Sequence, residues 1–136
     1  MKNEFEKINV VWMIVLSFIT LGIYFPVWFM KIKEVFDKLD TKQKISRSLI
    51  INLLVFTVLE LIFTILLFIP GSLIYQVSVY ILTNIFSWIS IILLLVLAFK
   101  VRNALNEHFT EIKFSGIATF LFTIFYLQNR INSLQK

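Results

Sequence analysis

Residues 49–99 read LIINLLVFTVLELIFTILLFIPGSLIYQVSVYILTNIFSWISIILLLVLAF, and this stretch decides the fold. It consists of two apolar runs, 49–69 and 76–99, which are separated by a turn that contains Pro70. The first run holds one acidic residue, Glu60, and the second holds no charged residue. Each run reaches the roughly 20 residues that a helix needs to cross a bilayer. The sequence therefore predicts an all-α integral membrane protein built around a central two-helix transmembrane hairpin.

The composition of the whole chain favours a membrane protein and excludes several other classes. Of its 136 residues, 59% are hydrophobic and 15% are charged, whereas about 25% of the residues in a soluble domain are charged. We expect one membrane domain over residues 1–136, because this length leaves no room for a second. The absence of cysteine excludes disulfides, thiol chemistry and metal sites that use cysteine.

Two further apolar segments flank the hairpin, at residues 8–30 and 114–127. Pro26 interrupts the first, because proline removes a backbone donor and presses on the carbonyl group of Gly22. This segment is either one kinked crossing or two half-helices that enter and leave on the same side, and we favour the second form. The short fourth segment spans only about 21 Å as a helix, which is typical of core, re-entrant or interfacial segments. The candidate kink motif consists of Thr20, Gly22, Tyr24, Pro26 and Trp28.

The connection after the first segment is basic and predicts contact with an anionic membrane surface. Within residues 31–40, apolar side chains recur at helical spacing opposite a charged face. This pattern predicts an amphipathic helix that lies among the lipid headgroups, extends the first segment to pack on its neighbours, or does both. The net charge of +5 does not indicate nucleic acid, because the aromatic residues lie in the apolar runs. We expect anionic headgroups at Lys31, Lys33, Lys38, Lys42, Lys44 and Arg47.

Polar side chains in the hairpin form two stripes that we expect to face each other. The stripes consist of Thr57, Glu60 and Thr64 in the first helix and of Thr83, Asn84, Ser87 and Ser90 in the second. Counting inward from the turn places Glu60 near Ser87, so we predict a hydrogen bond from Glu60 to Asn84 or Ser87. An acidic residue in mid-bilayer marks a functional-site hypothesis, although polar side chains between membrane helices also serve as structural contacts. The candidate intramembrane polar site comprises Glu60, Thr57, Thr64, Asn84 and Ser87.

The distribution of lysine and arginine predicts the orientation of the hairpin. Residues 31–48 contain six of them, residues 100–116 contain three, and the turn at 70–75 contains none. Because short basic loops stay in the cytoplasm, we predict a multi-pass protein of the cytoplasmic membrane with both basic loops inside and the turn outside. If both end segments cross fully, both termini lie outside; if both are re-entrant, every charge except that of Glu60 is cytoplasmic.

Both ends of the chain resemble one known family. Thr20-Leu21-Gly22-Ile23-Tyr24, followed by Trp28 and Lys31, resembles the opening signature of a prokaryotic membrane-protein family catalogued as domain of unknown function 4234. The segment Tyr126-Leu127-Gln128…Ile131-Asn132 is similar to that family's closing segment. The resemblance implies two strong hydrophobic helices between a signature first segment and a short last one. It implies no activity, substrate or cofactor.

A faint internal repeat links the two ends of the chain. At a shift of 99 residues, Thr20 falls on Thr119, Lys31 on Arg130 and Ile32 on Ile131. We therefore expect the two ends to play similar structural roles on either side of the hairpin.

The chain lacks the residue patterns that are typical of catalysis or cofactor binding. It has no Gly-rich phosphate loop, nucleophile elbow or Ser/His/Asp set. Glu107, His108 and Glu111 are a weak pattern for a metal site, so we expect no metal, no cofactor and no catalytic residue. The favoured function is that of a non-catalytic accessory, scaffold or lipid-interacting unit, as a homo-oligomer or within a larger membrane complex. The alternatives are an oligomeric proton or cation pathway that uses Glu60, and a membrane enzyme on the cytoplasmic face.

Overall fold

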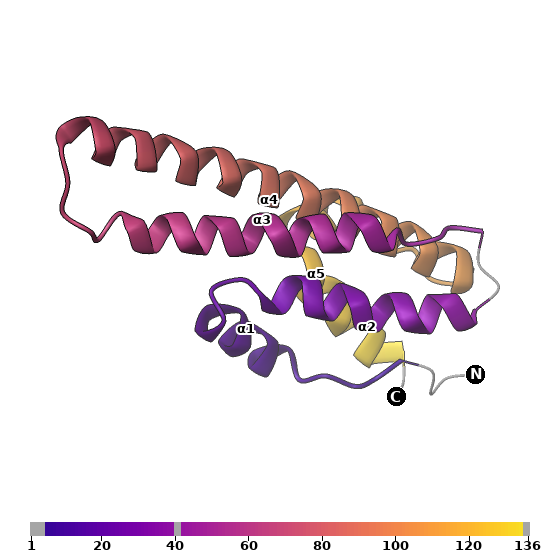
Figure 1. The fold of residues 1–136 in the computed structure, drawn as a ribbon. Coiled ribbons are helices and arrows are strands. Elements are labelled where there is room, and N and C mark those ends of the chain that lie inside the picture. The colour runs from indigo at the N-terminus through magenta and orange to yellow at the C-terminus, as the bar shows by residue number, and fades with distance from the viewer. Residues whose placement is uncertain (1–4, 40–41, 135–136) are drawn as a thin grey trace.

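The computed structural model describes residues 5–39 and 42–134, and this part of the chain contains five helices and no strand. Figure 1 shows two long helices, α3 and α4, lying side by side as an antiparallel hairpin, with the other helices gathered around one half of it. The all-α prediction is thus confirmed for the described residues. The helices are α1 (Val10–Ile19), α2 (Tyr24–Lys38), α3 (Arg47–Leu66), α4 (Leu73–His108) and α5 (Gly116–Leu134).

The predicted central hairpin corresponds to α3 and α4. Both helices are long and apolar enough to cross a membrane, by length and composition. In each, only 17% of the most apolar stretch is buried inside the molecule. The core helix of a soluble protein is mostly buried, so these two helices differ from it. Ser72 begins α4 by accepting a hydrogen bond from the backbone N–H of Tyr75, as an N-cap serine does.

The first apolar segment is broken into two helices that run in opposite directions (Figure 1). The turn between them follows a Schellman pattern: the N–H of Gly22 donates to the carbonyl of Ser17, and that of Leu21 to Phe18. Leu21 and Gly22 have positive φ angles of 49° and 92°. The structure therefore shows the reversal rather than a single kinked helix. An ion pair of 3.3 Å between Lys31 and Glu6 joins α2 to the segment that precedes α1.

Proline does not cause this break, contrary to expectation. Pro26 is buried in the first turn of α2, where the backbone N–H groups have no acceptor within the helix and proline costs nothing. The hydroxyl of Thr20 connects the two helices instead. It donates to the carbonyl of Leu16 at 2.7 Å and accepts from the N–H of Tyr24 at 3.0 Å.

The predicted helix over residues 31–40 is the second half of α2 and not a separate element; Asp40 lies outside the described residues. Its apolar stripe faces the protein, because Ile32 and Phe36 are 6% and 3% exposed. Of the two predicted environments for this stripe, the structure therefore shows packing on neighbouring helices. Contact of the charged face with headgroups stays a prediction.

The last segment is longer than predicted and is bent. α5 continues to Leu134, and Thr123 interrupts it with φ 43° and ψ −121°, a conformation outside the helical region. The bend brings the hydroxyl of Tyr126 back to the backbone N–H of Ser115, which donates to it at 2.9 Å. Both ends of the chain thus contain a broken apolar segment, although the internal repeat had led us to expect only similar structural roles.

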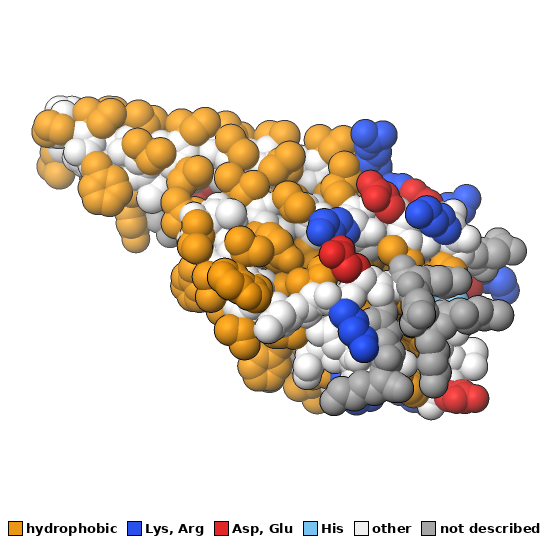
Figure 2. All heavy atoms as spheres, turned by 90° about the horizontal axis from the view of Figure 1, so that it is seen from below, with side chains coloured by type: hydrophobic (Ala, Val, Ile, Leu, Met, Phe, Trp, Pro, Cys, Tyr) orange, Lys and Arg blue, Asp and Glu red, His pale blue; other side chains and the backbone are white. Residues whose placement is uncertain are grey.

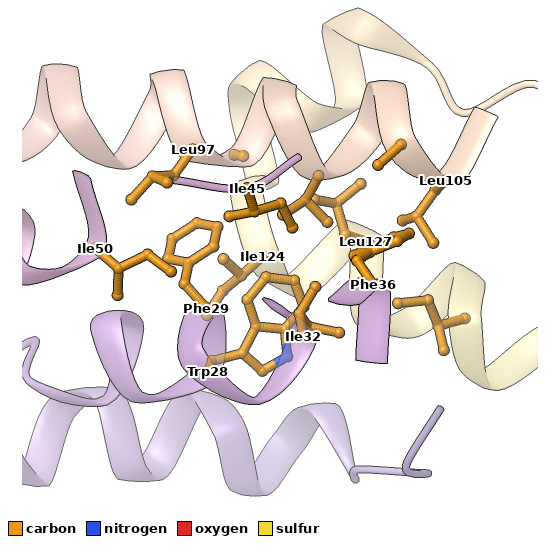
Figure 3. Close-up of a cluster of buried hydrophobic side chains, with 14 of the residues drawn as sticks. Trp28, Phe29, Ile32, Phe36, Ile45, Ile50, Leu97, Leu105, Ile124 and Leu127 are labelled. Carbon is orange, nitrogen blue, oxygen red and sulfur yellow. The ribbon is translucent and has the colours of Figure 1, made fainter. Parts of the chain in front are cut away.

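The core lies where the broken segments pack on the hairpin, in one half of the molecule. Figure 3 shows aromatic side chains of α2 in contact with aliphatic side chains of α4 and α5. The labelled residues are Trp28, Phe29, Ile32, Phe36, Ile45, Ile50, Leu97, Leu105, Ile124 and Leu127. The other half of the molecule is the bare tip of the α3–α4 hairpin (Figure 1).

Candidate functional site

The predicted contact between the two polar stripes is present at one point. The hydroxyl of Ser87 on α4 donates to Oε1 of Glu60 on α3 at 2.7 Å. This confirms the predicted register of the hairpin and one of the two predicted partners of Glu60. Among the hydrogen bonds of the described residues, it is the contact that joins polar side chains of these two helices.

Four other members of the stripes bond within their own helices, and one of them is Thr57, which donates to the carbonyl of Leu53 at 2.8 Å. The hydroxyl of Thr64 donates to the carbonyl of Glu60 at 2.7 Å, and that of Thr83 donates to Val79 at 2.9 Å. The amide of Asn84 donates to the carbonyl of Tyr80 at 2.8 Å. Of the two alternative partners predicted for Glu60, the structure therefore shows Ser87 and not Asn84. Thr64 and Asn84 are members of the predicted site that the structure leaves outside the cavity around Glu60.

Glu60 lines a partly open cavity of about 180 Å³, which we call the Glu60 hollow. The turn between α1 and α2 contributes to one wall, where a Cβ atom on Gly22 would lie 3.5 Å from Cγ2 of Thr57. The turn of the first segment thus reaches the level of Glu60. The lining residues are Leu21, Gly22, Phe25, Leu53, Thr57, Glu60, Ser87, Ser90, Ile91 and Leu94.

Ser90 belongs to this cavity although we did not include it in the predicted site. Its side chain is 8% exposed, and its Oγ is buried without a hydrogen-bond partner among the described residues. Ser90 follows Ser87 by three residues, so both lie on the same face of α4. The sequence could have assigned Ser90 to the site from this spacing, because Ser90 belongs to the same polar stripe as Ser87.

The residues of the candidate kink motif have separate roles. Thr20 and Gly22 form the turn, as described above, and Tyr24 begins α2. Trp28 lies away from the turn, fully buried in the core, and its Nε1–H donates to Oε1 of Gln128 at 2.9 Å. The motif is thus a structural link between α2 and α5 as well as a helix break.

Amide side chains of α5 hold the segment that precedes α1. Nε2 of Gln128 donates to the carbonyl of Glu6 at 3.0 Å and to Oδ1 of Asn132 at 2.9 Å. Asn132 bonds both backbone groups of Ile8, accepting from its N–H at 3.3 Å and donating to its carbonyl at 2.6 Å. These amides therefore satisfy backbone groups of an irregular segment that lies outside the helices.

The acidic and histidine side chains near the end of α4 have structural contacts. The carboxylate of Glu107 accepts from the N–H groups of Lys42 and Gln43 at 2.9 and 3.3 Å. The ring of His108 packs edge-on against Phe109 with 4.7 Å between the ring centres. Within residues 5–39 and 42–134, no three side chains of the metal-binding types gather at one place.

Charged side chains collect at one end of the molecule, which we call the charged end and which carries residues 31–39, 42–48 and 100–116. Figure 2 shows blue and red atoms at this end and an apolar surface over the remainder of the visible face. Glu60 lies apart from this end, beside Ser87 in the hairpin.

Comparison with known proteins identifies a family. The family model Domain of unknown function (DUF4234) matches residues 8–107. No curated protein and no solved structure matches the chain. The match covers most of the sequence, and the chain therefore belongs to the DUF4234 family.

Proposed function

We propose that this member of the DUF4234 family is a non-catalytic integral membrane protein that serves as a scaffold or accessory unit. In this proposal α3 and α4 cross the bilayer, while the α1–α2 pair and bent α5 enter from the charged end and return to it. The separation of charge from apolar surface is the observation that carries the proposal (Figure 2).

The apolar surface of the hairpin supports this placement. Large apolar side chains are exposed along both helices, including Ile62 and Ile65 on α3 and Trp88 and Ile92 on α4. Soluble proteins rarely expose continuous apolar patches of this kind. Exposing such side chains to lipid chains carries no free-energy penalty. The length of α3, about 30 Å, also matches the thickness of the hydrocarbon layer.

The first broken segment is compatible with lipid because the backbone N–H groups of its turn have hydrogen-bond partners. The turn at Leu21 and Gly22 satisfies its N–H groups internally, and protein packs on it from α3. Irregular backbone at membrane depth is tolerated only where protein covers it or water reaches it.

The orientation follows from the basic loops, which favour the cytoplasmic face. Lys38, Lys42, Lys44 and Arg47 are exposed at the charged end and have no ion pair among the described residues. They are available to anionic headgroups. Lys31 and Lys33 already pair with Glu6 and Asp37.

Single cysteines test the topology cleanly, because the natural chain has no cysteine. Ser72→Cys places a thiol at the hairpin turn, and Thr110→Cys places one in the loop after α4. In intact bacteria that express the chain, a membrane-impermeant maleimide should label Ser72→Cys, and it should label Thr110→Cys only after lysis. Labelling of both in intact cells would contradict the crossing, and recovery of the chain in the soluble fraction after carbonate washing would contradict membrane insertion.

A further inference from the structure

The starting point is the hydroxyl of Ser90, which is buried in the Glu60 hollow without a partner in the described chain. An unpaired buried hydroxyl costs free energy. Helical serines often recover this cost by bonding the carbonyl four residues earlier, as Ser17 does with Met13 in α1 at 2.7 Å. Ser90 makes no such bond, and its hydroxyl therefore lies beside the hollow without a partner among the described residues.

Three further oxygen-bearing side chains line the same cavity. Thr57 and Glu60 are three residues apart on α3, and Ser87 and Ser90 are three residues apart on α4, so each pair occupies one helix face. Glu60 and Ser87 are already in contact at 2.7 Å. The hydroxyl of Thr57 donates to the carbonyl of Leu53 at 2.8 Å. Its oxygen still has lone pairs that can coordinate a cation.

The chemistry of this set selects the class of ligand. All four side chains offer hard oxygen atoms, which suit hard cations rather than soft ones. The cavity contains one carboxyl group and no basic side chain. A monovalent cation would therefore neutralise the site, whereas a divalent cation would leave a net charge in an apolar surrounding, which is costly.

The size and place of the cavity fit a small ion. A volume of about 180 Å³ holds an ion with a few waters, since one water occupies about 30 Å³. The exposed side chains of Leu21 and Ile91 lie at its rim, so the cavity has an opening. Glu60 lies six residues, about 9 Å, from the end of α3 at Leu66, which is inside the hydrocarbon layer in the proposed placement.

We propose that the Glu60 hollow binds one monovalent metal cation, Na⁺ or K⁺. Glu60 supplies the negative charge, and Ser87, Ser90 and Thr57 supply neutral oxygen ligands. The site lies within one copy of the chain, between α3, α4 and the α1–α2 turn, and does not need an oligomer. Its depth rests on the proposed membrane placement, but its ligands do not.

Carbodiimide protection tests the site on the full-length protein in detergent micelles. Dicyclohexylcarbodiimide partitions into apolar regions and attaches to a carboxyl group that carries a proton. A cation bound to Glu60 blocks this reaction. Modification of the peptide that contains Glu60 should fall as NaCl or KCl replaces choline chloride at constant ionic strength, whereas modification of peptides with Glu34 or Glu107 should not change. Mass spectrometry measures both.

Variants distinguish a bound cation from a general salt effect. Ser90→Ala should raise the half-protecting cation concentration about tenfold, the effect of losing one polar ligand to a charged group, without altering modification in choline chloride. Ser87→Ala is a second test, in case one variant fails to fold. Ser78→Ala, an exposed serine of α4 outside the hollow, is the matched control and should keep the natural value.

Equal modification of Glu60 in choline, sodium and potassium salts would overturn the proposal. Protection that Ser90→Ala and Ser87→Ala leave unchanged would equally remove the proposed ligand set. Because the experiment is done in micelles, its failure would leave the cysteine topology result standing, and the reverse also holds.

Discussion

Leucine at position 21 occupies a backbone conformation that usually belongs to glycine. Its φ of 49° is the left-handed value found at the residue after a helix, where glycine is preferred because a Cβ atom crowds the following carbonyl. Gly22 follows with φ 92°, a value that L side chains rarely adopt. The turn therefore contains one strained residue and one that cannot be replaced without strain.

We expect Gly22→Ala to lower the free energy of unfolding by roughly 1–2 kcal/mol, because alanine pays the positive-φ cost. The space itself is not the obstacle, since a Cβ at this position meets Thr57 only at ordinary contact distance. Leu21→Gly should raise the free energy of unfolding by about 0.5–1 kcal/mol. Glycine relieves the positive-φ strain, but part of this gain is lost because glycine makes the unfolded chain more flexible. Denaturant unfolding in mild detergent, followed by circular dichroism, measures both.

Gly116→Ala is the matched control for the Gly22 prediction. Gly116 begins α5 without a positive φ, and a Cβ there would lie 3.6 Å from Cζ of Arg102, an ordinary contact. This variant should be close to neutral. A loss at position 116 as large as that at position 22 would show that the conformational argument is wrong.

Among the elements, α2, α5 and the segment before α1 are joined by one fully buried side chain. Gln128 is 0% exposed, and its side-chain amide forms hydrogen bonds with Trp28, Glu6 and Asn132. Side-chain amides at such a junction fix orientation, because each donor and acceptor has one direction. The two broken segments are therefore positioned by hydrogen bonds as well as by apolar packing.

Gln128→Met should lower stability by roughly 2–3 kcal/mol, because it leaves the indole N–H of Trp28 and the carbonyl of Glu6 without their partner. Methionine keeps the volume, so the change removes polarity alone. Gln76→Met is the control: its amide bonds the carbonyl of Ile69 at an exposed position, and its loss should cost less than about 0.5 kcal/mol. Equal effects in the same unfolding experiment would show that the buried amide has no special role.

At the scale of the whole molecule, the charged end is asymmetric in sign. The chain has 13 basic and 8 acidic residues, and part of the acidic set is already used in ion pairs with Lys31 and Lys33. The exposed cations of residues 38–47 therefore dominate the surface that would face the headgroups.

We predict that this end retains anionic lipid. A cation near an anionic surface contributes about 1 kcal/mol, so replacing Lys38, Lys42 and Lys44 together by glutamine should weaken retention at least tenfold at low salt. Native mass spectrometry of protein released from mixed neutral and anionic nanodiscs measures the bound lipid. Glu34→Gln and Glu111→Gln, at exposed positions of the same end, should preserve or increase it. Unchanged retention in the lysine variant would contradict the prediction.

The sequence by itself determined the central hairpin, the place of the turn and the register that brings Glu60 near Ser87, whereas the choice between Asn84 and Ser87 came from the structure. These features depend on run length and on helical periodicity, which are local and regular, so counting residues along two antiparallel helices is sufficient. The break at Gly22 was also predictable, although its cause was assigned to Pro26.

Only the tertiary structure decided how the ends fold back. The sequence left a single kinked crossing and a reversal open for residues 8–30, because the two differ in the φ angles of two residues and not in composition. It gave no sign that Thr123 bends α5, since threonine has no preference for that conformation. It grouped Ser90 with a polar stripe but did not show its hydroxyl unpaired, because the turn of α1 and α2 that helps to enclose it comes from a distant part of the chain.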